Sequence, residues 1–180
     1  MRKIIFAINV TIDGFADHTA MIADNELHDF FAGFLKKIDV VLYGRKTYEL
    51  MADFWPTAEK DPVSTKSMKD FAVEINSVSK IVFSKTLTNV KWMNTKLAQR
   101  NLIEEISGLK KQDGNNIAVG SLSLASQLAD YIDEFWFAVH PVILGEGTRL
   151  FPGLSEKYNL KLIDSKTLNS GVTVLHYIKS

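Results

Sequence analysis

Residues 40–49, VVLYGRKTYE, constrain the fold more than any other stretch, because a short apolar strand ends at a glycine and helix-forming residues begin at once. Gly44 lacks a Cβ, so it permits a tight turn and a close approach of the backbone to a ligand. The free N–H groups of the following helix point at that turn. Arg45, Lys46 and Thr47 add two cations and a hydroxyl. The pattern is typical of a phosphate cradle, and equally of an ordinary strand-to-helix connection with a solvated basic pair.

Two further expected strands end in similar chemistry. One apolar run stops at Ser84 and Lys85, and another stops at Gly120 and Ser121 before a helical pattern. Ligands of open parallel α/β sheets bind beyond the carboxyl ends of the strands. Three such loops, if adjacent, would therefore face a ligand with several phosphates. Taken alone, the first pair fits a solvated loop better, whereas the glycine of the second lets the backbone approach a ligand closely.

Strand-like and helical patterns alternate along the chain without a linker or an internal repeat, which predicts one α/β domain over residues 1–180. We expect helices at 26–38, directly after Gly44, and at 66–76, 101–109 and 123–131. We expect strands at 3–10, 40–43, 80–83, 116–119 and 134–144. Two last strands, 160–168 and 172–179, are joined by an Asn-Ser-Gly hairpin signal, so an antiparallel hairpin should extend a mostly parallel sheet.

Composition narrows the function. The 21 basic and 21 acidic side chains give a formal net charge of +0, so no global field attracts nucleic acid or an anionic membrane. The lack of cysteine excludes thiolate nucleophiles and Cys-ligated metals, and His140 and His176 lack metal-ligand spacing. No apolar run approaches the roughly 18 residues of a membrane helix. We expect a cytoplasmic protein that acts on a small molecule, without metal, membrane or nucleic-acid partners.

Several motifs together resemble a known family. They are NVTIDG at residues 9–14, YGRKTYE at 43–49, IVFSKTL at 81–87, VGSL at 119–122 and PVILGEG at 141–147. In this order and spacing they resemble the dihydrofolate-reductase-like superfamily over nearly the whole chain. The resemblance is greatest to stand-alone bacterial proteins related to the reductase domain of the bifunctional riboflavin-biosynthesis deaminase-reductase. It implies a three-layer α/β fold with helices on both faces of the sheet.

The resemblance also implies an NADPH-dependent reductase whose cofactor lies across the carboxyl ends of the strands. Matched motif by motif, it assigns the phosphates to Gly44, Arg45 and Thr47, the adenosine 2′-phosphate to Ser84 and Lys85, the pyrophosphate to Gly120, Ser121 and Leu122, and the nicotinamide border to Ala7. Independently of the family, cations at Arg45 and Lys85 without an acidic neighbour favour NADPH over NADH, because a carboxylate would repel the extra phosphate.

Hydride transfer also needs a proton and an oriented acceptor. Asp13, in a turn after the first strand, and Asn9, a polar residue on that strand, are candidates. An Asx turn and a satisfied core amide explain them as well. Dihydrofolate reductases carry a carboxylate on the first helix, and counting back from Gly44 leads to His28 with Asp29 beside it. A solvated helix flank also explains Asp29.

These observations predict a reductase that transfers hydride to a small heterocyclic, imine or carbonyl substrate. Riboflavin-pathway reductases typically carry Val-Glu-Gly-Gly where this chain has Ala-Val-Gly-Ser at 118–121, so a phosphoribosylamino-pyrimidine is one substrate among several. The alternatives are a nucleotide-binding module without turnover and a dihydrofolate reductase proper, which would need Asp29. The resemblance and the aromatic late strands lead us to expect a homodimer.

Overall fold

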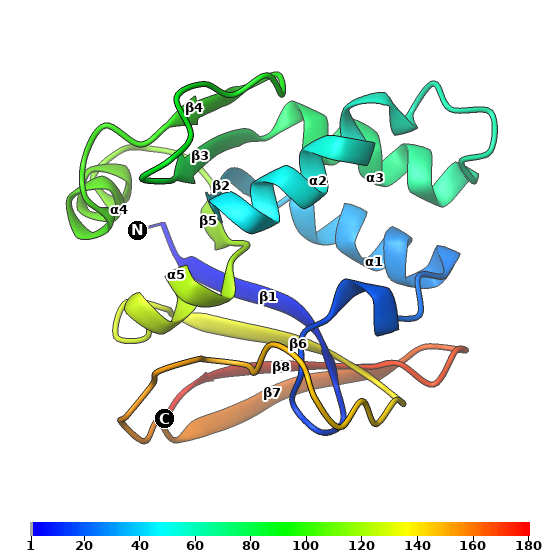
Figure 1. Cartoon of the computed structure of the whole chain (residues 1–180). Coiled ribbons are helices and arrows are strands. Elements are labelled where there is room, and N and C mark those ends of the chain that lie inside the picture. The colour runs from blue at the N-terminus through cyan, green and yellow to red at the C-terminus, as the bar shows by residue number, and fades with distance from the viewer. Residues whose placement is uncertain (1) are drawn as a thin grey trace.

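The computed structural model describes residues 2–180, which are built around one eight-stranded sheet (Figure 1). The strands follow the order β4-β3-β2-β5-β1-β6-β8-β7. Their bounds are β1 (Ile4–Thr11), β2 (Ile38–Gly44), β3 (Ser79–Phe83), β4 (Thr95–Leu97), β5 (Asn116–Val119), β6 (Glu134–His140), β7 (Leu160–Thr167) and β8 (Thr173–Lys179). The first six strands are parallel, and β8 runs antiparallel to both β6 and β7. The predicted mixed sheet with a C-terminal hairpin is confirmed.

Five α-helices and one short 3-10 helix connect the strands. They are η1 (His18–Ala20), α1 (Asn25–Leu35), α2 (Arg45–Ala58), α3 (Lys66–Ser77), α4 (Leu102–Lys110) and α5 (Leu122–Gln127). Side-chain oxygens of Asp24, Thr65 and Asn101 accept hydrogen bonds from backbone N–H groups in the first turns of α1, α3 and α4. Each such cap satisfies a donor that the helix itself leaves free.

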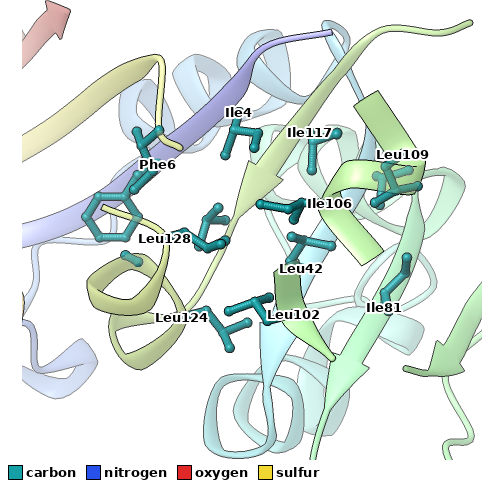
Figure 2. Packing of buried hydrophobic residues seen from close by; sticks show 14 of the residues in the cluster. Ile4, Phe6, Leu42, Ile81, Leu102, Ile106, Leu109, Ile117, Leu124 and Leu128 are labelled. Carbon is teal, nitrogen blue, oxygen red and sulfur yellow. The ribbon is translucent and has the colours of Figure 1, made fainter. Parts of the chain in front are cut away.

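The helices cover both faces of the sheet because side chains alternate along each strand. In β1, Ile4 and Phe6 pack with leucines and isoleucines of α4 and α5 (Figure 2). Ile5 points the other way, into a second cluster with α1, α2 and α3. Figure 1 shows these three helices together on their face. The result is the predicted three-layer α/β architecture.

Several element ends differ from the sequence expectations. The helix α5 stops at Gln127 instead of 131, because the chain turns after Leu128, whose carbonyl accepts from Tyr131 N. The strand β6 ends at His140 instead of 144, since Pro141 follows and has no N–H to continue a ladder. The helix after Gly44 runs through Pro56 to its end. Two elements, η1 and the three-residue β4, are too short to have given a pattern.

The sheet has an opening beside β1. The strand β5 ends at Val119, which lies opposite Phe6, whereas β1 continues to Thr11 and pairs with β6 along the way. From Ala7 onward β1 therefore has no strand partner on its β5 side within the described part of the chain. We call this gap the β1 notch. It lies at the end of the sheet where β2 and β5 also deliver their loops.

Candidate functional site

A cleft of about 980 Å³ lies at the carboxyl ends of β2, β3 and β5. Residues from all three loop tips singled out in the sequence line it: Gly44, Arg45, Thr47, Ser84, Lys85, Ser121 and Leu122. Ligand clefts usually measure about 300–1,000 Å³, so this one is large enough for an extended ligand. Three segments that are distant in sequence thus meet around one ligand-sized hollow.

The charged side chains that line the cleft are positive. Its lining contains Arg45, Lys46, Lys85 and Arg100, and none of the lining residues that the structure describes is acidic. Arg45 Nη1 lies 2.9 Å from Glu49 Oε2, but both side chains are largely exposed, and such surface pairs are weak. No side chain within residues 2–180 caps the N-terminus of α2, which leaves its first N–H groups to a ligand. The arrangement suits a polyanion.

Gly44 is required by the contact between two loops. Its φ of −81° is an ordinary value that any residue adopts, so the tight turn expected from the sequence is not the reason for glycine. A Cβ at this position would lie 2.8 Å from Ser121 Oγ. The ends of β2 and β5 touch here, and the glycine lets Ser121 reach the cleft.

Gly120 does not line the cleft. A Cβ built on it would lie 2.5 Å from Cε1 of the buried Tyr43 ring, on the opposite face of the strand. Ser84 lines the cleft and also folds its own loop, since its Oγ accepts from the N–H groups of Thr86 and Leu87 at 3.1 and 2.9 Å. Gly120 therefore has a packing role, while Ser84 combines loop geometry with access to a ligand.

Arg100 was missed by sequence reasoning. It follows β4, whose three residues gave no strand pattern, yet it lines the same cleft as Lys85. Its signal was the same as that of Lys85, a cation just beyond a strand. Ala16 and Thr148 line the cleft too, and their segments are joined by a hydrogen bond of 2.9 Å from Ala16 N to Thr148 O.

Ala7 and Asn9 lie outside the cleft lining, on the face of the sheet that α1 covers. Both belong to the part of β1 that borders the notch, and both stay partly exposed although β1 is a central strand. Asn9 Oδ1 lies 3.1 Å from Nε2 of the fully buried His140. Both side chains are therefore partly open at the β1 notch.

Asp13 is a fixed hydrogen-bond acceptor. Its carboxylate accepts from Thr11 Oγ1 at 2.6 Å, Leu144 N at 3.0 Å and Gly145 N at 2.7 Å. The hydrogen bond from Thr11, followed by those of the two backbone N–H groups, lowers the pKa of Asp13. A carboxylate held ionised in this way anchors the loop after β6 and is a poor proton donor. The structure thus gives Asp13 a structural role, but not the expected Asx turn, because Phe15 N donates to Thr11 Oγ1 and not to Asp13.

Asp29 is turned away from the cleft. It is exposed on α1, and its charge contributes, after the hydrogen bond and charge of Asp70, to raising the pKa of Lys66 on α3. The neighbouring His28 ring contacts Trp55 and Phe71. Within residues 2–180, no three His, Asp or Glu side chains come together as metal ligands, and no helix there is long and apolar enough to cross a membrane.

The sheet order and the cleft define the class of fold. The chain superposes over 99% of its length on dihydrofolate reductase from Enterococcus faecalis complexed with NADP(H), with a TM-score of 0.66, 14% identity and 96% of that chain covered. It also superposes over 99% on a pyrimidine reductase-like protein from Corynebacterium diphtheriae, with a TM-score of 0.73, 13% identity and 92% of that chain covered. The fold is that of dihydrofolate reductase.

The family is shown by sequence. The model of the RibD C-terminal domain matches residues 2–174, and the chain belongs to this family. It is similar to the uncharacterized protein YyaP of Bacillus subtilis (strain 168), with 35% identity over 182 residues that cover 98% of this chain and 94% of YyaP. The family resemblance stated from the motifs is confirmed.

Proposed function

We propose that the protein is an NADPH-dependent reductase that transfers hydride to a small heterocyclic, imine or carbonyl substrate and works as a single domain. The observation that carries the proposal is the cleft at three strand ends, lined by four cations and, among the described residues, by no carboxylate. Membership of the RibD C-terminal domain family and the shared fold with reductases support it.

The lining fits the parts of NADPH. The free N–H groups of α2 with Arg45 and Thr47 would hold phosphate, and Ser121 and Leu122 would pass close to the pyrophosphate. Lys85 would face the adenosine 2′-phosphate, with Ser84 and Arg100 on the same side as further donors. When bound, NADPH supplies the hydride from its nicotinamide ring. The small side chain of Ala7, beside the β1 notch, would leave room for that flat ring.

The proton of the reduction has no obvious donor among the candidate carboxylates. Asp13 is held ionised by three hydrogen bonds, and Asp29 faces α3 and solvent. We therefore propose that water supplies the proton. The same observation favours a second candidate, a nucleotide-binding module without turnover. NADPH oxidation measured with pterins, imines, quinones and pyrimidines, including 5-amino-6-(5-phosphoribosylamino)uracil, separates the two, because binding without turnover on every compound would favour the module.

NADPH should stabilise the protein. At a hundredfold excess over its Kd, it is expected to raise the free energy of unfolding by about 2.7 kcal/mol, because it binds only the folded state. A thermal-unfolding titration monitored by Trp fluorescence checks this, with NADH as the weaker comparison. Unchanged melting at millimolar NADPH would remove the basis of the reductase proposal.

We also propose that the protein is a homodimer in which the partner subunit covers β7. This edge strand pairs only with β8 within residues 2–180, and its Leu162 and Ile163 are 49% and 47% exposed. An edge strand that exposes large apolar side chains offers a surface for association. Light scattering should show a dimer for the wild type and a shift towards monomer for Ile163→Lys. Val63→Lys, at an 81% exposed loop position, is the matched control. A monomeric wild type would contradict the proposal.

A further inference from the structure

We propose that Asn9 recognises the substrate, because its Nδ2 donates a hydrogen bond to a substrate carbonyl oxygen. His140 is a positioning residue that fixes the orientation of the Asn9 side-chain amide. The inference rests on the proposed function, because it takes the β1 notch beside Ala7 as the place where substrate meets cofactor. It is carried by hydrogen bonds that leave the Asn9 side chain only one orientation.

The hydrogen bonds of His140 determine its tautomer. The backbone N–H of Ile22 lies 3.0 Å from His140 Nδ1 and has to donate to it, so Nδ1 is the acceptor nitrogen. Because Nδ1 accepts this bond it carries no proton and the ring is neutral, and burial, which lowers the pKa of His140, acts in the same direction. The single N–H hydrogen of the ring is therefore on Nε2, which lies 3.1 Å from Asn9 Oδ1 and donates to it.

This leaves the amide nitrogen of Asn9 free in a known direction. With Oδ1 held by His140, Nδ2 must point the other way, and no described residue accepts a hydrogen bond from it. Among the described residues, the buried side-chain polar atoms that lack a hydrogen-bond partner are Ser64 Oγ and Ser170 Oγ. Asn9 Nδ2 also lacks a partner but is not one of these buried atoms. Nδ2 is thus accessible. A satisfied core amide, the alternative explanation of Asn9, would need a second partner that these residues do not provide.

The position of Asn9 suits a substrate contact. It follows Ala7 by two residues on the same face of β1, about 7 Å away along the strand. Its support is rigid, since His140 is fully buried and is held in turn by the chain ahead of α1. A fixed N–H donor donates a hydrogen bond to a carbonyl oxygen and disfavours an amino group at the same place, because two donors would then face each other.

Two matched probes test this. Uracil carries carbonyl oxygens where 2,4-diaminopyrimidine carries amino groups, and ligand-observed NMR with saturating NADP⁺ measures both Kd values. The wild type should bind uracil at least about tenfold more tightly. In Asn9→Asp the preference should reverse, because the carboxylate accepts hydrogen bonds from amino groups. In His140→Leu the side-chain amide of Asn9 is no longer held and can flip, so the two Kd values should come within about threefold of each other.

His176→Leu is the matched control. His176 is a second histidine of this sheet; it is partly buried, hydrogen-bonds Glu134 Oε2 and stacks on Trp136, at the other end of β6. It should keep the uracil preference. The Kd for NADP⁺ should be unchanged in all three variants, which excludes general damage, because a lost fold would not reverse a preference between two probes.

The outcomes separate the inference from the proposed function. If NADP⁺ does not bind the wild type, the proposed function fails, and the same probe comparison without NADP⁺ still decides the role of Asn9. The inference is overturned if neither probe binds the wild type, if Asn9→Asp still prefers uracil, or if His140→Leu retains the full preference.

Discussion

Replacing Arg45 and Lys85 together by alanine raises the Kd for NADPH about 30- to 100-fold and that for NADH by a smaller factor, because Arg45 would hold a phosphate that both dinucleotides carry whereas Lys85 would face the 2′-phosphate. Both cations line the cleft; Lys85 has no carboxylate among the lining residues that the structure describes, and the pair of Arg45 with Glu49 is partly exposed and therefore weak. The 2′-phosphate is the group that distinguishes NADPH, so a loss concentrated on NADPH identifies its contacts. Fluorescence titration of each variant with both dinucleotides measures the effect.

Two further variants sharpen this test. Arg100→Ala should also weaken NADPH, because Arg100 is, like Lys85, a cation of the cleft lining just beyond a strand. Lys111→Ala removes an exposed cation just after α4, outside the cleft lining, and should change neither Kd. Equal losses of NADPH and NADH in the double variant would contradict the assigned phosphate contacts.

Gly120→Ala should be strongly destabilising, by about 3 kcal/mol, with a melting temperature lower by about 6–12 °C. The new Cβ would lie 2.5 Å from Cε1 and 2.9 Å from Cδ1 of Tyr43. That ring is 4% exposed and stacks near Trp92, with ring centroids 6.4 Å apart, so it has little room to move. Denaturant unfolding at neutral pH measures the change.

Gly33→Ala is the matched control for that variant. Gly33 lies inside α1, and a Cβ there would meet nothing within 4 Å. Alanine should therefore stabilise the protein by about 0.5–1 kcal/mol through its higher helix propensity. If Gly120→Ala unfolds like the wild type, the packing of Tyr43 against β5 is looser than the structure indicates.

Local patterns predicted the fold well because each main element carries its own signal. Short apolar runs marked the strands of the parallel core, and the Asn-Ser-Gly turn marked the hairpin between β7 and β8. The errors lie where tertiary context decides. The strand β4 exists because it pairs with β3, and α5 ends early because the chain must turn into β6. Neither cause is visible in a short window of sequence.

The candidate site was predicted in part, and the reason differs from residue to residue. A cation or glycine directly after a strand is a local signal, and it led to Arg45 and Lys85 in the cleft lining. Arg100 was not predicted because β4, the strand before it, was not predicted. The orientation of Asn9 depends on His140, 131 positions away in the sequence, and on the N–H of Ile22. Such a relay can be found only when the three are seen in space.

The short β5 also affects the mechanics of the sheet. Only three register pairs, Ile4 to Phe6 with Ile117 to Val119, join the block β4-β3-β2-β5 to the block β1-β6-β8-β7, whereas seven pairs join β1 to β6. This seam should bend more easily than the neighbouring seam between β1 and β6, since fewer backbone hydrogen bonds resist there. A dinucleotide bound across this seam would contact both blocks and restrict their relative motion. The sheet should therefore become stiffer as the fraction of protein with bound dinucleotide increases.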